Sequence, residues 1–240
     1  MTHRVLLVGG SPEPSSGDTL RRAAKDCSAV IAIDRGLDAL LAAGIRCDLF
    51  CGDADSVSPA GAGLVRAAES AAEPDASQAP VDVAGEHLAH RFDVVRYDPH
   101  KDDTDLGLAL AEVARRWPDA NLRCTCMSGG APDHALAVLG RLTAYSGCVE
   151  VWEDSFVQRI LKAGDCWELA GHRDERFTFI PLSVEAVVSE RGMRWNLDHK
   201  RVALLSDLGV SNVIDSDGAA IMCHEGVIAA WAFKGYFAGA

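Results

Sequence analysis

The stretch AVIAIDRGLDALLAAGIRCDLFCGDADS, residues 29–56, decides the fold class. It holds two apolar runs, AVIAID and CDLFCGD, which end in glycine or aspartate and are separated by a helix-like segment. Three more runs of this kind stand in the first 130 residues: RVLLVGG, FDVVRYD and LRCTCMSGG. Short apolar runs that alternate with helical segments are typical of a doubly wound α/β layer. We therefore expect an N-terminal α/β domain whose sheet is mostly parallel, with helices on both faces.

The pattern changes after about residue 147. The chain then carries short apolar runs, among them CVEVWED, RFTFIPL and GVIAAWAF, separated by glycine, aspartate and charged turns. Such spacing predicts a small C-terminal β-sandwich. We expect the α/β domain to span residues 1–147 and the sandwich residues 148–240. Residues 60–92 are rich in Ala, Glu, Pro and Ser, so we expect a partly mobile insertion there, with a short helical start.

Composition excludes several classes of function. The 240 residues are 48% hydrophobic and carry a formal net charge of −12, with only five lysines, which argues against a nucleic-acid-binding protein. No apolar run approaches the length of a membrane span. Several of the eight cysteines lie in apolar runs, namely Cys47, Cys51, Cys124 and Cys126, and no signal peptide opens the sequence, so we expect reduced thiols and a cytoplasmic location.

Acidic residues follow several of the predicted strands. In α/β sheets ligands gather at the carboxyl ends of the strands, and the acids that fall just past those ends are Asp34, Asp53, Asp55, Asp98, Asp102, Asp105 and Asp133. In GDADS, residues 52–56, two carboxylates at positions i and i+2 can converge on one hard cation. Val57 and Leu64 stand where a calcium loop needs oxygen ligands, so Mg²⁺ fits better than Ca²⁺. The alternative is that these acids only form a turn.

Two further motifs have a similar design. KDDTD, residues 101–105, places a lysine among acids before a helical segment; Lys101 is either a clamp on a polyphosphate or part of a local salt bridge. These acids could instead cap the helix. In SGGAPDHALAVL, residues 128–139, a diglycine turn precedes Asp133 and His134, which open a helix. For Asp133, too, a plain capping role is the alternative.

Taken together, the motifs GDxDS, KDxTD and GGxxDHxL, preceded by DxGxxxLLxxGIxxD at residues 34–48, resemble the thiamine pyrophosphokinase family. GMRWNL at residues 192–197 and VSN at residues 210–212 resemble the C-terminal motifs of the same family. The resemblance implies transfer of the terminal diphosphate of ATP to the hydroxyethyl oxygen of thiamine, which leaves AMP. It also implies an α/β nucleotide domain, a β-sandwich, and a homodimer with thiamine bound between the subunits.

The resemblance suggests a role for each matching residue. The expected ligands of Mg²⁺, direct or through water, are Asp53, Asp55, Asp102 and Asp105. Lys101 adds a positive charge at the β- or γ-phosphate of ATP. Asp133 orients, and deprotonates, the attacking hydroxyl, with Asp105 as the alternative base. Thiamine contacts Trp195, Ser211 and Asn212. The remaining expected binding positions are Asp34, Gly52, Ser56, Thr104, Gly129, Gly130 and His134.

The sequence also departs from the family pattern. Ala131 stands where the family usually has arginine, Val138 where it often has asparagine, and Arg35 where it usually has glycine. Two alternative functions stay open at this stage. One is a pyrophosphokinase for another alcohol, such as a pterin. The other, motivated by Ala131, is a catalytically weak protein that binds thiamine or nucleotide as a regulator.

Overall fold

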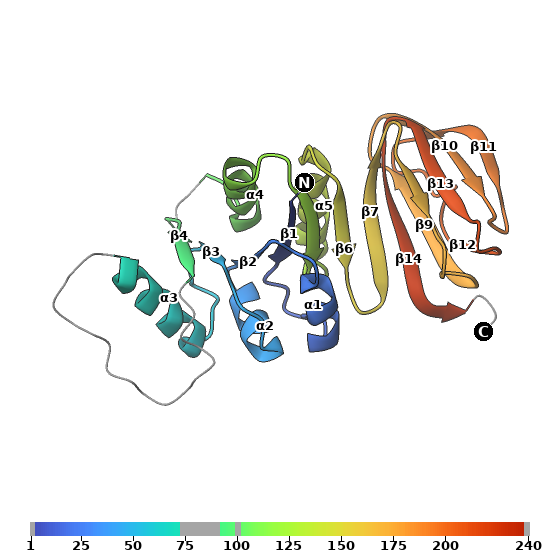
Figure 1. Cartoon of the computed structure of the whole chain (residues 1–240). Helices are drawn as coiled ribbons and strands as arrows, with labels where there is room; N and C mark the ends of the chain where they lie inside the picture. The colour runs from blue at the N-terminus through green and yellow to red at the C-terminus, as the bar shows by residue number, and fades with distance from the viewer. Residues whose placement is uncertain (1–2, 73–91, 99–101, 238–240) are drawn as a thin grey trace. The chain divides into compact units, whose positions relative to one another are not determined.

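The computed structural model describes residues 3–72, 92–98 and 102–237. The chain divides into two compact units, Met1–Val138 and Leu139–Ala240. Figure 1 shows helices and strands in the first unit and strands in the second. Of the helices in the described ranges, none is both long and apolar enough to cross a membrane.

The N-terminal unit contains a parallel sheet in the order β5-β1-β2-β3-β4. Its strands coincide with the five runs predicted from the sequence: β1 Arg4–Val8, β2 Ala29–Ile33, β3 Leu49–Gly52, β4 Asp93–Arg96 and β5 Asn121–Thr125. β2 is buried at every position, because a central parallel strand is covered on both faces. The predicted doubly wound α/β architecture is confirmed.

Within the described ranges each of these strands is followed by a helix: α1 Gly17–Ala24, α2 Gly36–Ala43, α3 Pro59–Ala72, α4 Asp105–Arg116 and α5 Pro132–Ala144. Figure 1 shows α1 and α2 on one side of the strands and α4 on the other. α4 buries Leu106, Leu110 and Val113, the periodic apolar face expected of a helix on a sheet. α5 continues past Val138, the last residue of the first unit.

Strand order fixes where a ligand can bind. The chain adds β2, β3 and β4 on one side of β1, and then returns to place β5 on the other side. This reversal is a topological switch point, and in open α/β sheets the ligand crevice lies outside the carboxyl ends of the strands at such a point. The loops after β1, β2, β3 and β5 therefore share the edge that binds ligands.

The helical start expected for the insertion is present, and it is longer and more closely packed than expected. Residues 60–72 belong to α3, which buries Gly61, Val65 and Ala68 at helical spacing. Glu69 on this helix also pairs with Arg96 at the end of β4, at 3.6 Å. The Ala-rich composition of this stretch suits a helix, since alanine has the highest helix propensity. Residues 73–91, the rest of the predicted insertion, lie outside the described ranges.

The C-terminal unit is a β-sandwich of antiparallel strands, as predicted. One layer has the order β12-β9-β14-β7-β6 and the other β11-β10-β13-β8. The bounds are β6 Val149–Trp152, β7 Phe156–Lys162, β8 Cys166–Glu168, β9 Glu175–Pro181, β10 Glu185–Arg191, β11 Leu197–Ala203, β12 Asn212–Val213, β13 Ala220–Glu225 and β14 Val227–Phe237. The two layers enclose a core that includes Trp167, Phe177 and Phe179.

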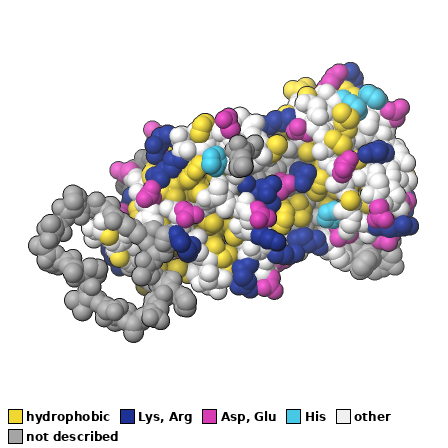
Figure 2. Space-filling model, viewed as in Figure 1, with side chains coloured by type: hydrophobic (Ala, Val, Ile, Leu, Met, Phe, Trp, Pro, Cys, Tyr) yellow, Lys and Arg dark blue, Asp and Glu magenta, His cyan; other side chains and the backbone are white. Residues whose placement is uncertain are grey.

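Two expectations from composition can be compared with the structure. All eight cysteines are free thiols, and the four quoted from apolar runs, Cys47, Cys51, Cys124 and Cys126, are buried. On the face shown in Figure 2, basic side chains are interspersed with acidic and apolar ones among the residues drawn in colour.

Candidate active site

Three carboxylates meet at the ligand-binding edge of the parallel sheet. Asp34 follows β2, and Asp53 and Asp55 follow β3. β2 and β3 are paired neighbours, with Ile33 opposite Cys51, so the residues that follow them lie side by side. One carboxylate oxygen of each acid lies within 4.8 Å of those of the other two. Such a group suits a divalent cation with oxygen ligands.

Asp34 is the buried member of this group, with 8% of its surface exposed. The hydroxyl of Ser56 donates a hydrogen bond to its Oδ2. Its Oδ1 is buried and has no hydrogen-bond partner among the described residues. Gly52 makes this arrangement possible, because a Cβ there would meet both Cα and Cβ of Asp34 at 3.2 Å. One oxygen of Asp34 is thus anchored and the other remains available to a ligand.

The electrostatics of Asp34 favour a cation. Burial raises the pKa of its carboxyl above the ordinary value, and the hydrogen bond from Ser56 partly opposes this rise. The carboxylates of Asp105, Asp55 and Asp53 raise the pKa of Asp34 further by repulsion. A cation among these acids removes both penalties, since it replaces the lost solvation and compensates the like charges. The donor set therefore fits Mg²⁺.

The loop after β3 presents its acids through a tight turn. The backbone N–H of Asp55 donates to Oδ1 of Asp53 at 3.1 Å, and Ala54 between them has a left-handed φ of 61°. Asp53 is half-buried and Asp55 exposed. Arg35, one of the departures from the family pattern, is exposed and its Nε donates to the carbonyl of Ser56 at 3.3 Å. This departure therefore places a positive charge beside the acidic loop.

At the start of α4 the residue that caps the helix is a threonine and not one of the neighbouring acids. Thr104 is the N-cap, and its side chain accepts a hydrogen bond from the N–H of Gly107 at 3.1 Å. Asp105 lies in the first turn and contributes to the field at Asp34, whereas Asp102 is exposed. Neither belongs to the group of three close carboxylates, so their metal role stays a prediction. Lys101 lies outside the described residues.

The loops after β1 and β5 lie against each other. The hydroxyl of Ser11 donates to the carbonyl of Ser128, and the N–H of Ser11 donates to the carbonyl of Cys126 at 3.2 Å. Gly129 and Gly130 follow with left-handed φ values of 99° and 73°, a turn that side chains disfavour. Asp133 and His134 then stand in the exposed first turn of α5. Asp133 is not part of the acidic group, and its catalytic role stays a prediction.

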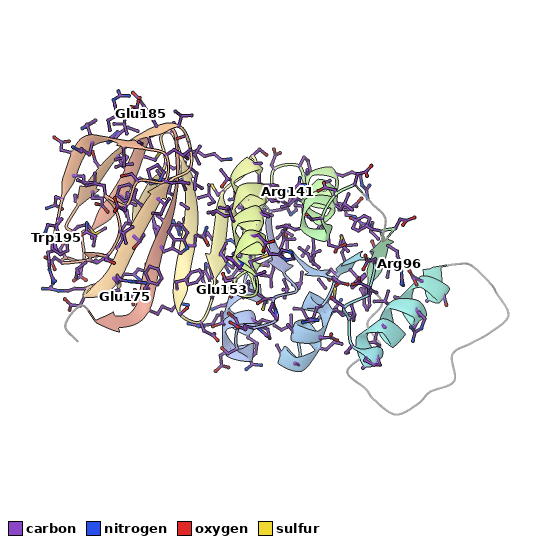
Figure 3. The ribbon with its side chains drawn as sticks, turned by 180° about the vertical axis from the view of Figure 1, so that it is seen from behind. Arg96, Arg141, Glu153, Glu175, Glu185 and Trp195 are labelled. Atoms are coloured by element: carbon purple, nitrogen blue, oxygen red, sulfur yellow. The ribbon has the colours of Figure 1, made fainter. Side chains whose placement is uncertain are left out.

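The three residues predicted to contact thiamine lie in the sandwich unit and differ in exposure. Trp195 is 59% exposed, and Figure 3 shows it at the margin of the sandwich. Ser211 is also exposed, and has a left-handed φ of 62°. Asn212 is only 5% exposed and directs its amide at the backbone of Trp195. The motifs at residues 192–197 and 210–212 predicted a binding role for all three residues, but they did not indicate that two are exposed and one is buried.

Glu190 is not among the site residues predicted from the sequence. This carboxylic acid is 2% exposed, and burial raises its pKa to about 7, although a hydrogen bond from Asn212 opposes the rise. A signal was present in the sequence, because Glu190 stands at the same alternation position in β10 as the buried Ala186 and Val188. A carboxylic acid at a core position of a strand is uncommon, and such a residue is a candidate functional residue.

Comparisons with known proteins agree with this geometry. A family model described as "Thiamin pyrophosphokinase, catalytic domain" matches residues 20–152, and one described as "Thiamin pyrophosphokinase, vitamin B1 binding domain" matches residues 171–228. The first covers the acidic group and the second covers Glu190, Trp195 and Asn212. No match among curated proteins reaches significance.

Solved structures share the fold over nearly the whole chain. Thiamine pyrophosphokinase from Bacillus subtilis is 20% identical, with a TM-score of 0.75 over 97% of this chain and 100% of that one. The protein from Geobacillus thermodenitrificans is 23% identical, with a TM-score of 0.72 over 96% and 97%. The enzyme from Candida albicans is 14% identical, with a TM-score of 0.71 over 97% and 90%. The first family model matches more than half of the residues of this chain. The chain therefore belongs to the thiamin pyrophosphokinase family, whose members transfer diphosphate from ATP to thiamine.

Proposed function

We propose that Asp34, Asp53 and Asp55 together bind the Mg²⁺ with which the enzyme uses ATP. The observation that carries this proposal is the buried Oδ1 of Asp34, which has no hydrogen-bond partner among the described residues and belongs to a group of three close carboxylates. The sequence assigned Asp34 to substrate binding only. The geometry supports adding it to the metal ligands, because its second oxygen is already fixed by Ser56.

Each residue around this group has a proposed part in diphosphate transfer. When bound, Mg²⁺ supplies positive charge to the phosphate oxygens on which negative charge builds. Asp105 and Asp102 at the start of α4 extend the acidic set, through water where they do not reach the ion. Lys101 holds the β- or γ-phosphate as a point charge. The N–H groups at Gly129 and Gly130 and the side chains of Thr104 and His134 complete the substrate site.

Asp133 is proposed to position the hydroxyl of thiamine and accept its proton. Its exposed place in the first turn of α5 supports this role, because a base must reach a substrate that enters from solvent. Asp105 is the alternative base. Its position beside Asp34 favours the metal role instead, since a carboxylate near a cation has a lowered proton affinity.

Thiamine is proposed to pack on Trp195. A flat cationic heterocycle gains both dispersion and cation–π attraction on an indole face, and the ring of Trp195 is 59% exposed. Ser211 is exposed and its hydroxyl can hydrogen-bond to the aminopyrimidine. Asn212 was expected to contact thiamine directly. Its hydrogen bonds to Trp195, Val213 and Glu190 support a role in holding Trp195 instead.

The protein is further proposed to act as a cytoplasmic homodimer with the thiamine site at the subunit interface. Exposed apolar side chains on the sandwich unit support this proposal: Leu204, Leu205, Leu208 and Val210 are all more than two-fifths exposed, at 48%, 61%, 50% and 46%. An apolar stretch of this kind on a soluble unit marks an interaction surface. The free state of all eight cysteines is compatible with a reducing compartment.

Product analysis tests the reaction and the metal ligands together. Incubation with ATP, Mg²⁺ and thiamine should give AMP and thiamine diphosphate in equal amounts. Asp34→Asn should reduce turnover at least a hundredfold, as removal of a metal ligand does. Asp119→Asn, which changes an exposed acid in the turn before β5, should not. Formation of ADP contradicts diphosphate transfer, and an Asp34→Asn enzyme within threefold of the wild type contradicts the role of Asp34.

A further inference from the structure

Asn212 holds the backbone of Trp195 in the manner of a paired strand. Its Oδ1 accepts from the N–H of Trp195 at 3.2 Å, and its Nδ2 donates to the carbonyl of the same residue at 2.8 Å. The two residues are 17 positions apart, so this is a long-range tie. A side-chain amide that pairs with both the N–H and the carbonyl of one residue holds the backbone of that residue in place.

Glu190 is a further hydrogen-bond partner of the Asn212 amide. Oε2 of Glu190 accepts from Nδ2 of Asn212 at 3.1 Å, while the N–H of Val213 occupies the second acceptor position of Oδ1 at 2.9 Å. All four hydrogen-bonding positions of the amide are therefore used. The reversed amide would face two acceptor oxygens, of Glu190 and Trp195, with its own Oδ1 and two N–H donors with its Nδ2. The carboxyl of Glu190 thus reinforces the orientation that holds Trp195.

The held residue presents its ring to solvent. Trp195 is 59% exposed although both of its backbone polar groups are tied to the buried Asn212. Its neighbour Arg194 lies with its guanidinium 5.9 Å from the indole centroid and pairs with Asp215 at 3.4 Å. A ring on a fixed backbone loses less conformational freedom when a ligand packs on it, which favours binding.

Burial of Glu190 costs stability. The residue is 2% exposed, and its Oε1 is buried without a hydrogen-bond partner among the described residues. An apolar side chain at this core position avoids the cost of desolvating a carboxyl. Residues that cost stability are concentrated where they serve binding or catalysis. The acid is therefore better explained by what it does to Asn212 than by packing.

We propose that Glu190 is a positioning residue for thiamine: acting through Asn212, it fixes the backbone of Trp195 and so holds the exposed indole ready for the substrate. The inference rests on the proposed role of Trp195 in thiamine binding. It adds a residue from the core of the sandwich to the determinants of substrate affinity. Glu190 itself needs no contact with thiamine for this role.

Two substitutions of Glu190 distinguish the effect of its hydrogen bond from the effect of its side-chain volume. Glu190→Met keeps the volume but removes the acceptor, so the amide of Asn212 loses one of its four hydrogen bonds and holds Trp195 less firmly; we expect KM for thiamine to rise about fivefold to tenfold, as for one lost hydrogen bond. The kcat and the KM for ATP should stay within twofold. Glu190→Gln retains an acceptor oxygen and should restore the thiamine KM to within twofold of wild type. Glu185→Met, an exposed acid on the same strand β10 that pairs with Arg201, is the matched control and should change neither KM.

The ring itself provides a readout without catalysis. In protein labelled with 5-fluorotryptophan, Trp195→Phe assigns the ¹⁹F signal of Trp195. That signal should shift or broaden in Glu190→Met and stay at the wild-type position in Glu190→Gln and Glu185→Met. An unchanged signal in folded Glu190→Met overturns the inference. So does a loss of kcat with an unchanged KM for thiamine, which is the result of a purely structural defect.

A double substitution distinguishes failure of this inference from failure of the proposed thiamine site. If Trp195 binds thiamine, Trp195→Ala should raise the KM for thiamine, and adding Glu190→Met to it should raise the KM no further, since the effect passes through the missing ring. Fully additive effects overturn the inference. If Trp195→Ala leaves KM unchanged, the proposed role of Trp195 fails and with it the link from Glu190 to affinity, while the ¹⁹F signal still tests the positioning of the ring.

Discussion

The hydroxyl of Ser56 donates a hydrogen bond to Oδ2 of Asp34, across 22 residues of sequence. This bond joins the loop after β3 to the end of β2 and fixes which oxygen of Asp34 is left for a ligand. The free oxygen, Oδ1, stands with Asp53 and Asp55 in the group of three close carboxylates. A serine in GDADS thus orients a proposed metal ligand that belongs to a different motif.

Thermal melts should distinguish the metal-free state of the three close carboxylates from their state with Mg²⁺ and nucleotide bound. In the metal-free protein Asp34 is repelled by its neighbours, so Asp34→Asn should leave the melting temperature unchanged or raise it slightly. Mg²⁺ with a non-hydrolysable ATP analogue should raise the melting temperature of the wild type, because a ligand at a hundred times its Kd adds about 2.7 kcal/mol. Asp34→Asn should lose most of that rise, and Asp119→Asn should keep all of it. A full ligand-induced rise in Asp34→Asn argues against the assignment.

The start of α4 offers a test of capping against charge. Thr104→Ala should lower the free energy of unfolding by about 1 kcal/mol, the usual cost of losing an N-cap. Asp102→Asn should not destabilise the metal-free protein, since Thr104 and not Asp102 caps the helix, and should reduce the response to Mg²⁺ and nucleotide. Urea unfolding of both variants, with and without ligand, gives the comparison. A destabilised Asp102→Asn protein with a normal ligand response would falsify this division of roles.

Local sequence patterns predicted the fold better than they predicted the arrangement of residues in the candidate site. The parallel strands were readable because each apolar run ends in glycine or aspartate before a helical segment, a signal contained within about ten residues. The place of Asp34 in the group of three close carboxylates depends on the pairing of β2 with β3, which no local pattern encodes. In the same way Thr104 and the acids beside it are equally good caps by composition, and only the structure shows which one receives the N–H of Gly107.

Glu190 predicts a specific dependence of stability on pH. Its pKa is raised from 4.5 to about 7 in the folded protein, so the folded state binds the proton more tightly than the unfolded state. The contribution of Glu190 to stability is therefore fully present below pH 4.5 and is lost as the pH rises to 7. At about 1.4 kcal/mol per unit the loss is on the order of 3 kcal/mol.

Glu190→Gln removes this titration, so its free energy of unfolding should fall less than that of the wild type between pH 4.5 and 7.5. Urea unfolding at several pH values measures the difference, in which the other acids cancel because both proteins share them. Glu185→Gln, at an exposed position of the same strand, should follow the wild type. Parallel curves for Glu190→Gln and the wild type would show that Glu190 titrates normally.

The dimer proposal predicts complementation between two variants with impaired sites. If each thiamine site combines acids of one subunit with the tryptophan of its partner, a mixed dimer of Asp53→Asn and Trp195→Ala has one intact site and one doubly changed site. Random exchange of subunits should then restore roughly a quarter of the wild-type sites. Activity is measured after the two variants are co-expressed, with each variant alone as the control. If the mixture is no more active than the average of the separate variants, each site belongs to a single subunit or the protein is not a dimer.

The most direct measurement of the central claim is metal binding itself. Mn²⁺ can stand in for Mg²⁺, since both prefer oxygen ligands in octahedral geometry, and its electron paramagnetic resonance signal reports the free ion. In the presence of a non-hydrolysable ATP analogue, the wild type and Asp119→Asn should bind Mn²⁺ with the same Kd, and Asp34→Asn, Asp53→Asn and Asp55→Asn should each raise that Kd at least tenfold. Equal Kd values for the wild type and the three variants at residues 34, 53 and 55 would contradict the claim that these carboxylates hold the metal.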